Sequence, residues 1–222
     1  MRRLAGLTFL LAFTTSTARA DKLVLVAGGG DGGDGTEATK AKLIQPFGVD
    51  FWDTSDAGSV ILIVEMVKGE RLRVILPNGK LETLAGSEGV KGNAGDGDSA
   101  KKATFNGMHS LAVGPSGVYL ADTWNNRVRI YHLSRVDAFA GTGEKGFSGD
   151  GGPAKEAKFG GIYCVSFDPD KKNLYITDLD NRRIRKVDME TKTVTTVAGN
   201  GQKGWRRGDE ATAGRSACTR GG

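Results

Sequence analysis

The sequence predicts an all-β protein, a β-propeller built from four-stranded antiparallel blades. Three observations support this fold: a regular internal repeat, four strand-like runs in each repeat, and an unusual amount of glycine. Of the 222 residues, 34 are glycine, which is about twice ordinary usage and indicates many tight turns between short strands. Beyond Ala20 the chain shows no helical periodicity.

The repeat is marked by two motifs that recur at nearly constant spacing. The first is Arg-x-Arg, which begins at Arg71, Arg127 and Arg183, so that its two intervals have the same length. The second is an Ala-Gly dipeptide that opens a loop rich in glycine and aspartate. Equal intervals rarely arise by chance, so these motifs define repeat units. The units span residues 27–84, 85–139 and 140–197, and a fourth starts at residue 198.

Each unit contains four strand-like runs bounded by turn residues. The expected first strands are 47–51, 110–113 and 163–167, and the expected second strands are 60–64, 118–121 and 174–177. The third strands begin at the Arg-x-Arg motifs, and the fourth strands are expected at 81–84, 136–139 and 194–197. A thirteenth strand is expected at 23–26, because this run also precedes an Ala-Gly dipeptide. Four short antiparallel strands in each unit are typical of a propeller blade.

Residues 1–20 have the pattern of a secretory signal peptide. Arg2 and Arg3 form a charged start, residues 4–13 are apolar, and Ala18 and Ala20 are small residues at the positions that a signal peptidase recognises. The apolar run is too short for a membrane-spanning helix, which needs about 20 residues. We therefore expect cleavage after Ala20 and a secreted or periplasmic protein that has no membrane contact; an uncleaved membrane anchor is the alternative.

The positive charge lies mainly at the two ends of the chain. The formal net charge is +5, but three arginines lie within residues 1–20, and the tail after residue 204 holds four arginines against two acids. Residues 21–204 are therefore formally neutral. Nucleic acid is not an expected partner, because phosphate binding needs a basic surface.

The two cysteines are not expected to form a disulfide. Cys164 lies in an apolar run and is expected to be a small buried residue of a strand, whereas Cys218 lies in a polar tail. No histidine stands in a recognisable relation to Cys164, so a catalytic thiol is not predicted either.

Two segments carry a family resemblance. Leu120 to Ile130 and Ile176 to Asp188 resemble the Asp-Thr-x-Asn-x-Arg-Ile-Arg-Lys core of NHL repeats, and the loop 140–154 is similar to the inter-blade loop of secreted bacterial members. The resemblance covers residues 27 to about 204 and implies a six-bladed propeller, of which this chain holds about 3.5 blades. The tail 205–222 has no strand-like run. We interpret it as a truncated or frame-shifted reading frame, with a natural flexible tail as the alternative.

The predicted topology gathers two kinds of polar connection at one end of the blades. The turn from the second to the third strand and the loop to the next blade emerge at the same end of a four-stranded meander, and propellers commonly bind ligands there. The first unit departs from the pattern, because Glu65 replaces the expected aspartate and residues 66–70 lengthen the turn. The candidate binding residues at this end are Asp122, Asn125, Asp178, Asn181, Trp124, His109 and Tyr163.

The first strands align so that Phe47, His109 and Tyr163 occupy the same position, near the entrance of the central channel. His109 is the one candidate for a general base or a metal ligand. A zinc centre needs three or four ligands, and the sequence shows no recognisable Ser-His-Asp triad. The simpler interpretation of His109 is a hydrogen-bonded histidine at the start of a strand. No catalytic residue is predicted.

The acidic loops and the arginines have structural interpretations. Asp-Gly is the chemistry of tight turns, and calcium binding is the alternative for these carboxylates. The arginines, at alternate positions of the third strands, are expected to form ion pairs or backbone contacts within or between blades. No resident cofactor is predicted. The loop aspartates are Asp31, Asp34, Asp96 and Asp150; the arginines are Arg71, Arg73, Arg127, Arg129, Arg183 and Arg185.

These features predict an exported binding or scaffold module whose loop end takes a protein, a peptide or a glycan. The alternative is a metal-dependent hydrolase or lyase similar to the gluconolactonase (SMP-30) and strictosidine-synthase-like propellers. Such enzymes hold a metal with acidic residues in the channel, where this chain has Phe47, His109 and Tyr163. An open arc of blades is also expected to self-associate, because it exposes blade faces. The apolar residues expected on those faces are Val49, Phe51, Ile61, Ile63, Val194 and Val197.

Overall fold

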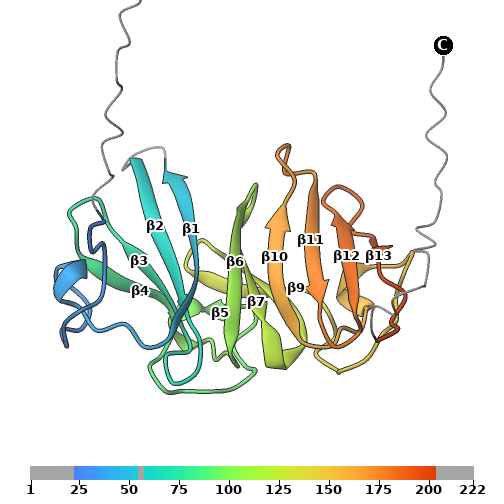
Figure 1. Ribbon diagram of the computed structural model, residues 1–222, viewed down its shortest axis with the longest axis horizontal. Helices are drawn as coiled ribbons and strands as arrows, with labels where there is room; N and C mark the ends of the chain where they lie inside the picture. Colours follow the sequence, from blue (N-terminus) through green and yellow to red (C-terminus); the bar gives the residue numbers. More distant parts are fainter. Residues whose placement is uncertain (1–22, 55–57, 204–222) are drawn as a thin grey trace, which may run out of the picture.

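The described part of the chain forms three antiparallel sheets, two of four strands and one of five, that lie side by side as propeller blades (Figure 1). The structure is a computed structural model, and it describes residues 23–54 and 58–203. The predicted all-β fold is confirmed: no α-helix occurs in these residues, which hold only four short 3-10 turns besides the strands. The turns are η1 (Ala38–Lys40), η2 (Ala100–Lys102), η3 (Thr123–Asn125) and η4 (Ala154–Glu156).

Each blade is a meander in which consecutive strands pair in chain order. The first blade contains β1 (Pro46–Thr54), β2 (Gly58–Glu65), β3 (Arg71–Ile75) and β4 (Leu81–Gly86). The second contains β6 (Met108–Gly114), β7 (Gly117–Asp122), β8 (Arg127–His132) and β9 (Arg135–Ala140). The third contains β10 (Ile162–Phe167), β11 (Asn173–Asp178), β12 (Arg183–Asp188) and β13 (Val194–Ala198). All four strands expected in each unit are therefore present.

The prediction of a strand at 23–26 is wrong. This segment has no regular structure, and its four apolar side chains are exposed. A strand requires a neighbour to accept its backbone hydrogen bonds, and no described segment pairs with this one. The thirteenth strand is instead β5 (Asp98–Ser99), which the sequence did not indicate and which pairs with β9.

Each loop rich in glycine and aspartate folds onto the blade that follows it in the chain. In the second unit, Asp98 of β5 pairs with Val136 of β9. The other two units repeat this contact as single bridges, Glu37 with Lys80 and Pro153 with Thr193. The loop and its blade thus form one structural unit, in which the first residue of each 3-10 turn donates its N–H to the turn before the outermost strand: Ala38 to Gly79, Ala100 to Ser134 and Ala154 to Lys192.

Two apolar cores lie between adjacent blades and hold the arc together. Phe105, from the loop before the second blade, packs with Leu62 and Leu120 of the first and second blades. Phe159, at the same place in the next unit, packs with Tyr119 and Ile176 of the second and third blades. These side chains are buried, and burial of such apolar area is the main source of stability in the arc.

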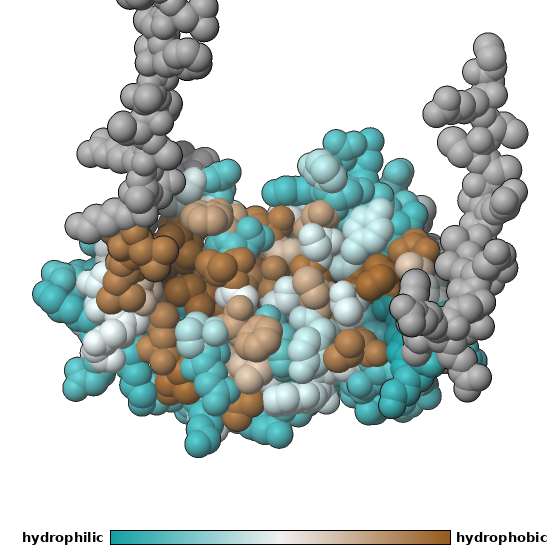
Figure 2. Space-filling model, viewed as in Figure 1, coloured by the Kyte–Doolittle hydropathy of each residue, from teal (hydrophilic) through white to brown (hydrophobic). Residues whose placement is uncertain are grey.

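The outer faces of the first and third blades differ from the expected pattern. Val49, Phe51 and Val197 are exposed as expected. On the face viewed in Figure 2, apolar surface is most extensive over the first blade. Ile63 is buried, however, because η1 and the residues after it cover it in a third core. Val194 is also buried, because it points into the core between the second and third blades. Ile61 is partly buried against the same third core as Ile63.

Cys164 is exposed, so the prediction of a buried cysteine is wrong. The pairing of β10 with β11 shifts register between Ile162 and Cys164. After this bulge, Val165 points into the core between the blades, while Cys164 and Ser166 point to the opposite side. Cys218, the predicted signal peptide at 1–20 and the tail 205–222 lie outside the described residues.

No helix in residues 23–54 or 58–203 is long and apolar enough to cross a membrane.

The second arginine of each Arg-x-Arg motif joins the loop to its blade from inside. Arg73, Arg129 and Arg185 are among the largest fully buried side chains. The guanidinium of Arg129 donates to the Asp96 carboxylate at 2.8 Å and to the Thr104 and Ala94 carbonyls at 2.8 and 3.0 Å. A buried guanidinium needs such partners for its donors. In all three units the buried arginine pairs with an aspartate of the preceding loop, and we call this pair the arginine clamp.

Replacing Arg129 with lysine tests the arginine clamp. A lysine ammonium cannot reach the carboxylate and both carbonyls in one planar fork, so Arg129→Lys is expected to lower the free energy of unfolding by about 2 kcal/mol. The measurement is urea denaturation of the full chain. The matched control is Arg135→Lys on the surface of the same blade, where the arginine side chain is 54% exposed. Equal loss of stability in both variants would contradict the clamp.

Candidate functional site

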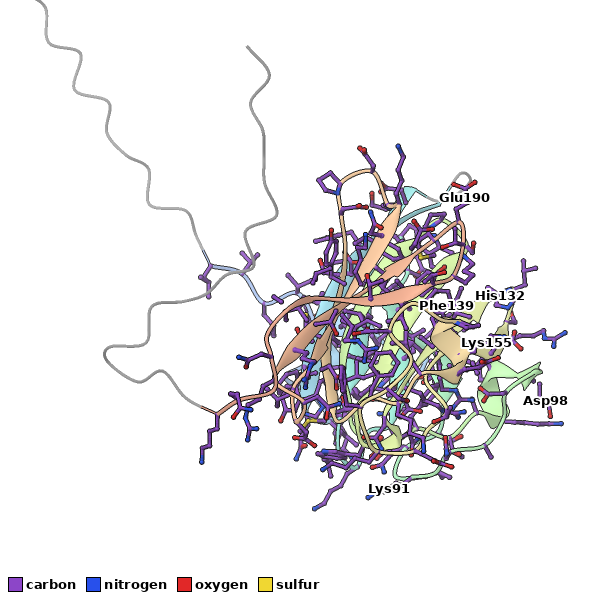
Figure 3. The ribbon with its side chains drawn as sticks, turned by 90° about the vertical axis from the view of Figure 1, so that its right-hand side faces the viewer. Lys91, Asp98, His132, Phe139, Lys155 and Glu190 are labelled. Carbon is purple, nitrogen blue, oxygen red and sulfur yellow. The ribbon has the colours of Figure 1, made fainter. Side chains whose placement is uncertain are left out.

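The two ends of the blades have different chemistry. One end, here called the loop face, carries the loops between blades and the connections from second to third strands; the other, the hairpin face, carries the remaining turns. Figure 3 shows Lys91, from the loop before β6, and Glu190, from the β12–β13 turn, at opposite ends of the molecule. Asn125 and Asn181 donate to the Gly92 and Gly146 carbonyls at 2.7 and 2.6 Å, so the turns and the loops do meet at one end.

The predicted binding aspartates lie inside the blades. Asp122 is fully buried; it accepts hydrogen bonds from the backbone N–H of Asn106 at 2.8 Å and from the Asn125 amide at 2.9 Å. Asp178 is also fully buried and receives the Gly160 N–H at 2.7 Å and the Asn181 amide at 2.9 Å. The structure therefore places these two carboxylates in the framework of the turn and not on the surface that meets a ligand.

Glu65 takes the same place in the first blade. Its carboxylate is buried, accepts the Ile44 N–H at 2.7 Å and pairs with Arg71 at 2.6 Å and Arg73 at 3.3 Å. Ile44 lies two residues before β1, just as Asn106 and Gly160 lie two residues before β6 and β10. The longer glutamate side chain thus accepts the same backbone hydrogen bond as the aspartates of the other two units. The comparison of the three units in the sequence did not predict this equivalence.

The loop aspartates belong to the arginine clamps. Asp34 pairs with Arg73 at 2.9 Å. Asp96 pairs with Arg127 at 2.6 Å and with Arg129 at 2.7 Å. In the third unit Asp150 pairs with Arg185 at 2.8 Å. Asp31 is exposed. Among the described residues, no three His, Cys, Asp or Glu side chains are grouped so that they could hold a metal ion.

The remaining arginines contact the loop face. Arg71 pairs with Glu88 at 3.0 Å as well as with Glu65. Arg183 donates to the Asn181 and Asn200 carbonyls at 2.8 and 3.0 Å and lies over the Phe147 ring, 3.7 Å from its centroid. These contacts order the loops next to the exposed surface of this end.

Four aromatic side chains form a cluster on the loop face. The His109 ring lies 4.7 Å from Phe47, 4.2 Å from Tyr163 and 5.5 Å from Trp124, measured between ring centroids. Phe47, His109 and Tyr163 come from the innermost strands of three successive blades, and Trp124 comes from η3. His109 is only 4% exposed, whereas Phe47, Trp124 and Tyr163 are 57%, 44% and 38% exposed. We call these four residues the aromatic cluster.

The Trp124 ring of the aromatic cluster packs against the Gly107 backbone. Gly107 has φ of 67°, and a Cβ at this position would overlap the Trp124 ring, so the indole rests directly on the backbone. Lys91 lies over the same ring, 5.8 Å from its centroid. The Gly107 N–H in turn donates to the buried Glu70 carboxylate at 2.8 Å. A ligand that contacts Trp124 would therefore meet a ring that is already packed in place, which lowers the entropic cost of binding.

A cavity lies at the opposite, hairpin end of the same three innermost strands. Its volume is about 400 Å³, and its lining includes Asp50, Leu111, Ser166 and Phe167. The Asp50 carboxylate accepts the Val113 N–H at 2.8 Å and so bridges the first and second blades. The cavity contains none of the sequence-predicted binding residues.

No family model matches the chain. A curated relative, the chloroplastic protein SUPPRESSOR OF QUENCHING 1 of Arabidopsis thaliana, is 26% identical over 59% of this chain and 15% of the relative. An auxiliary nutrient binding protein of Bacteroides thetaiotaomicron matches with 25% identity and a TM-score of 0.49, covering 57% of this chain and 34% of that one. A protein of the same description from Bacteroides ovatus has 20% identity and a TM-score of 0.48, with shares of 62% and 35%. The chain thus spans well under half the length of these proteins.

The pH dependence of stability tests the buried state of Asp122. Burial raises the pKa of Asp122 to about 6. The nearest guanidinium nitrogens, on Arg127 and Arg129, are 3.8 Å away and offset the effect of burial only in part. The folded state therefore takes up a proton between about pH 6 and pH 4 that the unfolded state does not, and this group makes stability fall as pH rises through that window.

Asp122→Asn removes this titration. The difference in unfolding free energy between wild type and Asp122→Asn is expected to be largest near pH 4 and to shrink toward pH 7, by about 1.4 kcal/mol for each unit of pKa difference. The measurement is urea denaturation at a series of pH values. A difference that stays constant from pH 4 to pH 7 would contradict the raised pKa.

Calcium is expected to leave the melting temperature unchanged. The carboxylates of Asp34, Asp96 and Asp150 already neutralise clamp arginines, and a ligand stabilises a protein only if it prefers the folded state. The measurement is thermal unfolding with millimolar calcium or with a chelator. A rise of several degrees in calcium that Asp34→Ala abolishes would show that the loops bind the ion.

Proposed function

We propose that this chain is an exported NHL-type binding module that takes a protein, a peptide or a glycan through its loop face. The observation that carries the proposal is the aromatic cluster. Three half-exposed rings from three blades meet around one buried histidine, and exposed aromatic side chains of this kind are enriched where proteins bind their partners. The signal-peptide pattern of residues 1–20 supports export.

The site favours binding over metal-dependent catalysis. The innermost strands of the described blades carry Phe47, His109 and Tyr163 near their loop-face ends, the positions where the alternative enzymes would need carboxylates. The acidic side chains of the neighbouring turns, Asp122 and Asp178, are buried and hydrogen-bonded within those turns. A rigid surface with exposed rings suits recognition, which needs complementary contacts and no reactive group.

A double variant of the aromatic cluster tests the proposed function. Trp124→Ala with Tyr163→Ala should abolish retention of ligands, because it removes two of the three exposed rings. The labelled full chain is applied to a displayed peptide library and to an array of immobilised glycans. Binders of the wild type are expected to be lost by the double variant.

The control variant is Leu133→Ala. Leu133 is 88% exposed and lies between β8 and β9, on the hairpin face. This variant should retain every binder. Ligands retained by the double variant and lost by Leu133→Ala would place recognition on the other end of the blades, and the absence of any ligand for the wild type would contradict a binding function.

A further inference from the structure

We infer that the open side of the third blade holds a second binding site, which takes the C-terminal phenylalanine of a peptide. The ring enters a cavity on this blade, and the terminal carboxylate pairs with Arg182. The cavity contains no residue of the aromatic cluster, so the inference goes beyond the proposed function and does not depend on it. Three observations carry it: a space that the other blades fill with phenylalanine, an arginine at the turn beside it, and the charges at its mouth.

The first two blades show what fills the corresponding space when another blade follows. Phe105 and Phe159, from the loops before the second and third blades, are fully buried. Each lies in one core with three side chains of the preceding blade, all of them 0% exposed. These side chains are Val64, Leu72 and Ala85 in the first blade and Ala121, Val128 and Ala140 in the second. The three positions form what we call the phenylalanine socket.

The third blade, at one end of the arc (Figure 1), has the same socket. Thr177, Ile184 and Ala198 pair across β11, β12 and β13 in the register of the socket residues of the other blades. A cavity of about 310 Å³ lies here, within the size range of small-ligand pockets, about 300–1,000 Å³. Ala198 is exposed and Ile184 is half-buried, so no described residue fills this third socket.

The turn beside each socket supplies a contact to the chain that enters it. The Glu70 carboxylate accepts the Gly107 N–H at 2.8 Å, and Oδ1 of Asn126 accepts the Gly161 N–H at 3.0 Å; each N–H lies two residues after the socket phenylalanine. Arg182 takes this place in the third blade, and all three turn residues have φ of 51° or –53° excluded, at 51°. A guanidinium only donates, so the third socket requires an acceptor from its occupant.

The charges at the mouth of the third socket favour an anionic acceptor. Arg182 is exposed, and its guanidinium has one acceptor among the described residues, the Gly201 carbonyl at 2.9 Å. Arg183 adds a second positive charge to the lining. The acidic lining residue, Asp178, is fully buried and pairs with Arg185 at 3.5 Å. A carboxylate can therefore meet the remaining N–H groups of Arg182 as a bidentate partner.

These requirements define the ligand. The C-terminal residue of a peptide carries a side chain and a carboxylate on the same Cα, and phenylalanine is the side chain that fills the equivalent sockets. A neutral sugar has neither an apolar side chain nor a carboxylate. A free amino acid would bring its ammonium group next to Arg182 and Arg183, which would repel it.

The test is fluorescence anisotropy of the full chain with a peptide of sequence Gly-Ser-Gly-Ser-Gly-Phe that carries a dye at its N-terminus. The peptide with a free C-terminal carboxylate is expected to bind. The same peptide with a C-terminal amide should bind about tenfold more weakly, because it loses the charged pair with Arg182. A peptide that ends in serine should bind more weakly still, because it leaves the socket empty.

Two variants separate the arginine from the socket. Arg182→Asn introduces the residue that the second blade has at this turn, and it should remove the preference for the carboxylate over the amide. Ala198→Leu places a larger side chain in the socket and should weaken binding of both phenylalanine peptides about tenfold. The matched control is Lys171→Asn, which removes a positive charge at a residue with φ of 55° on the hairpin face. Lys171→Asn and Trp124→Ala should both bind as the wild type does.

Circular dichroism and thermal unfolding of each variant show whether it folds. No binding of the carboxylate peptide by the wild type would overturn the inference, and so would equal affinity of the wild type for carboxylate and amide. Binding that Trp124→Ala abolishes and Ala198→Leu retains would also overturn it but leave the proposed function standing. Self-association in sedimentation that Ala198→Leu abolishes, with no peptide bound, would assign the socket to a second copy of the chain and overturn the inference.

Discussion

The arginine clamp is the interaction on which the rest of this structure depends. Arg73, Arg129 and Arg185 place a permanent charge inside each blade, and such a charge is tolerated only with several hydrogen-bond acceptors around it. The acceptors come from the loop that precedes the blade, for example Asp96, Ala94 and Thr104 around Arg129. The need to satisfy one buried side chain thus folds a long glycine-rich loop onto its own sheet and makes loop and blade a single unit.

The same clamp positions the loop face. Once the loop is fixed, its carbonyls accept from Asn125 and Asn181, and these turns hold the residues beside them. Lys91 and Lys145 occupy the same position in successive loops, and each contacts the residue before the turn asparagine: Trp124 in one unit and Asp180 in the next. The framework therefore repeats while the exposed residue changes, which is how a repeated blade acquires one specialised surface.

Side chains also cross between the innermost strands. Asp50 of β1 accepts the Val113 N–H of β6 at 2.8 Å, and Ser110 of β6 accepts the Val165 N–H of β10 at 3.3 Å. These N–H groups lie on the free inner edge of each sheet, where no further strand pairs with them. The bridges keep β1, β6 and β10 close enough for the Phe47, His109 and Tyr163 rings to touch. Contact within the aromatic cluster is thus a product of blade packing.

The sequence by itself determined the blades. Alternation, turn residues and the regular repeat are local signals, and they located the strands of all three units and the shared register of Phe47, His109 and Tyr163. Tertiary structure alone decided which polar residues are buried. Asp122 and Cys164 show the reason. Hydrogen bonds from the Asn106 N–H and the Asn125 amide hold Asp122 inside its turn, and a bulge in β10 turns Cys164 outward. Burial depends on partners distant in the chain, which no local pattern of residues records.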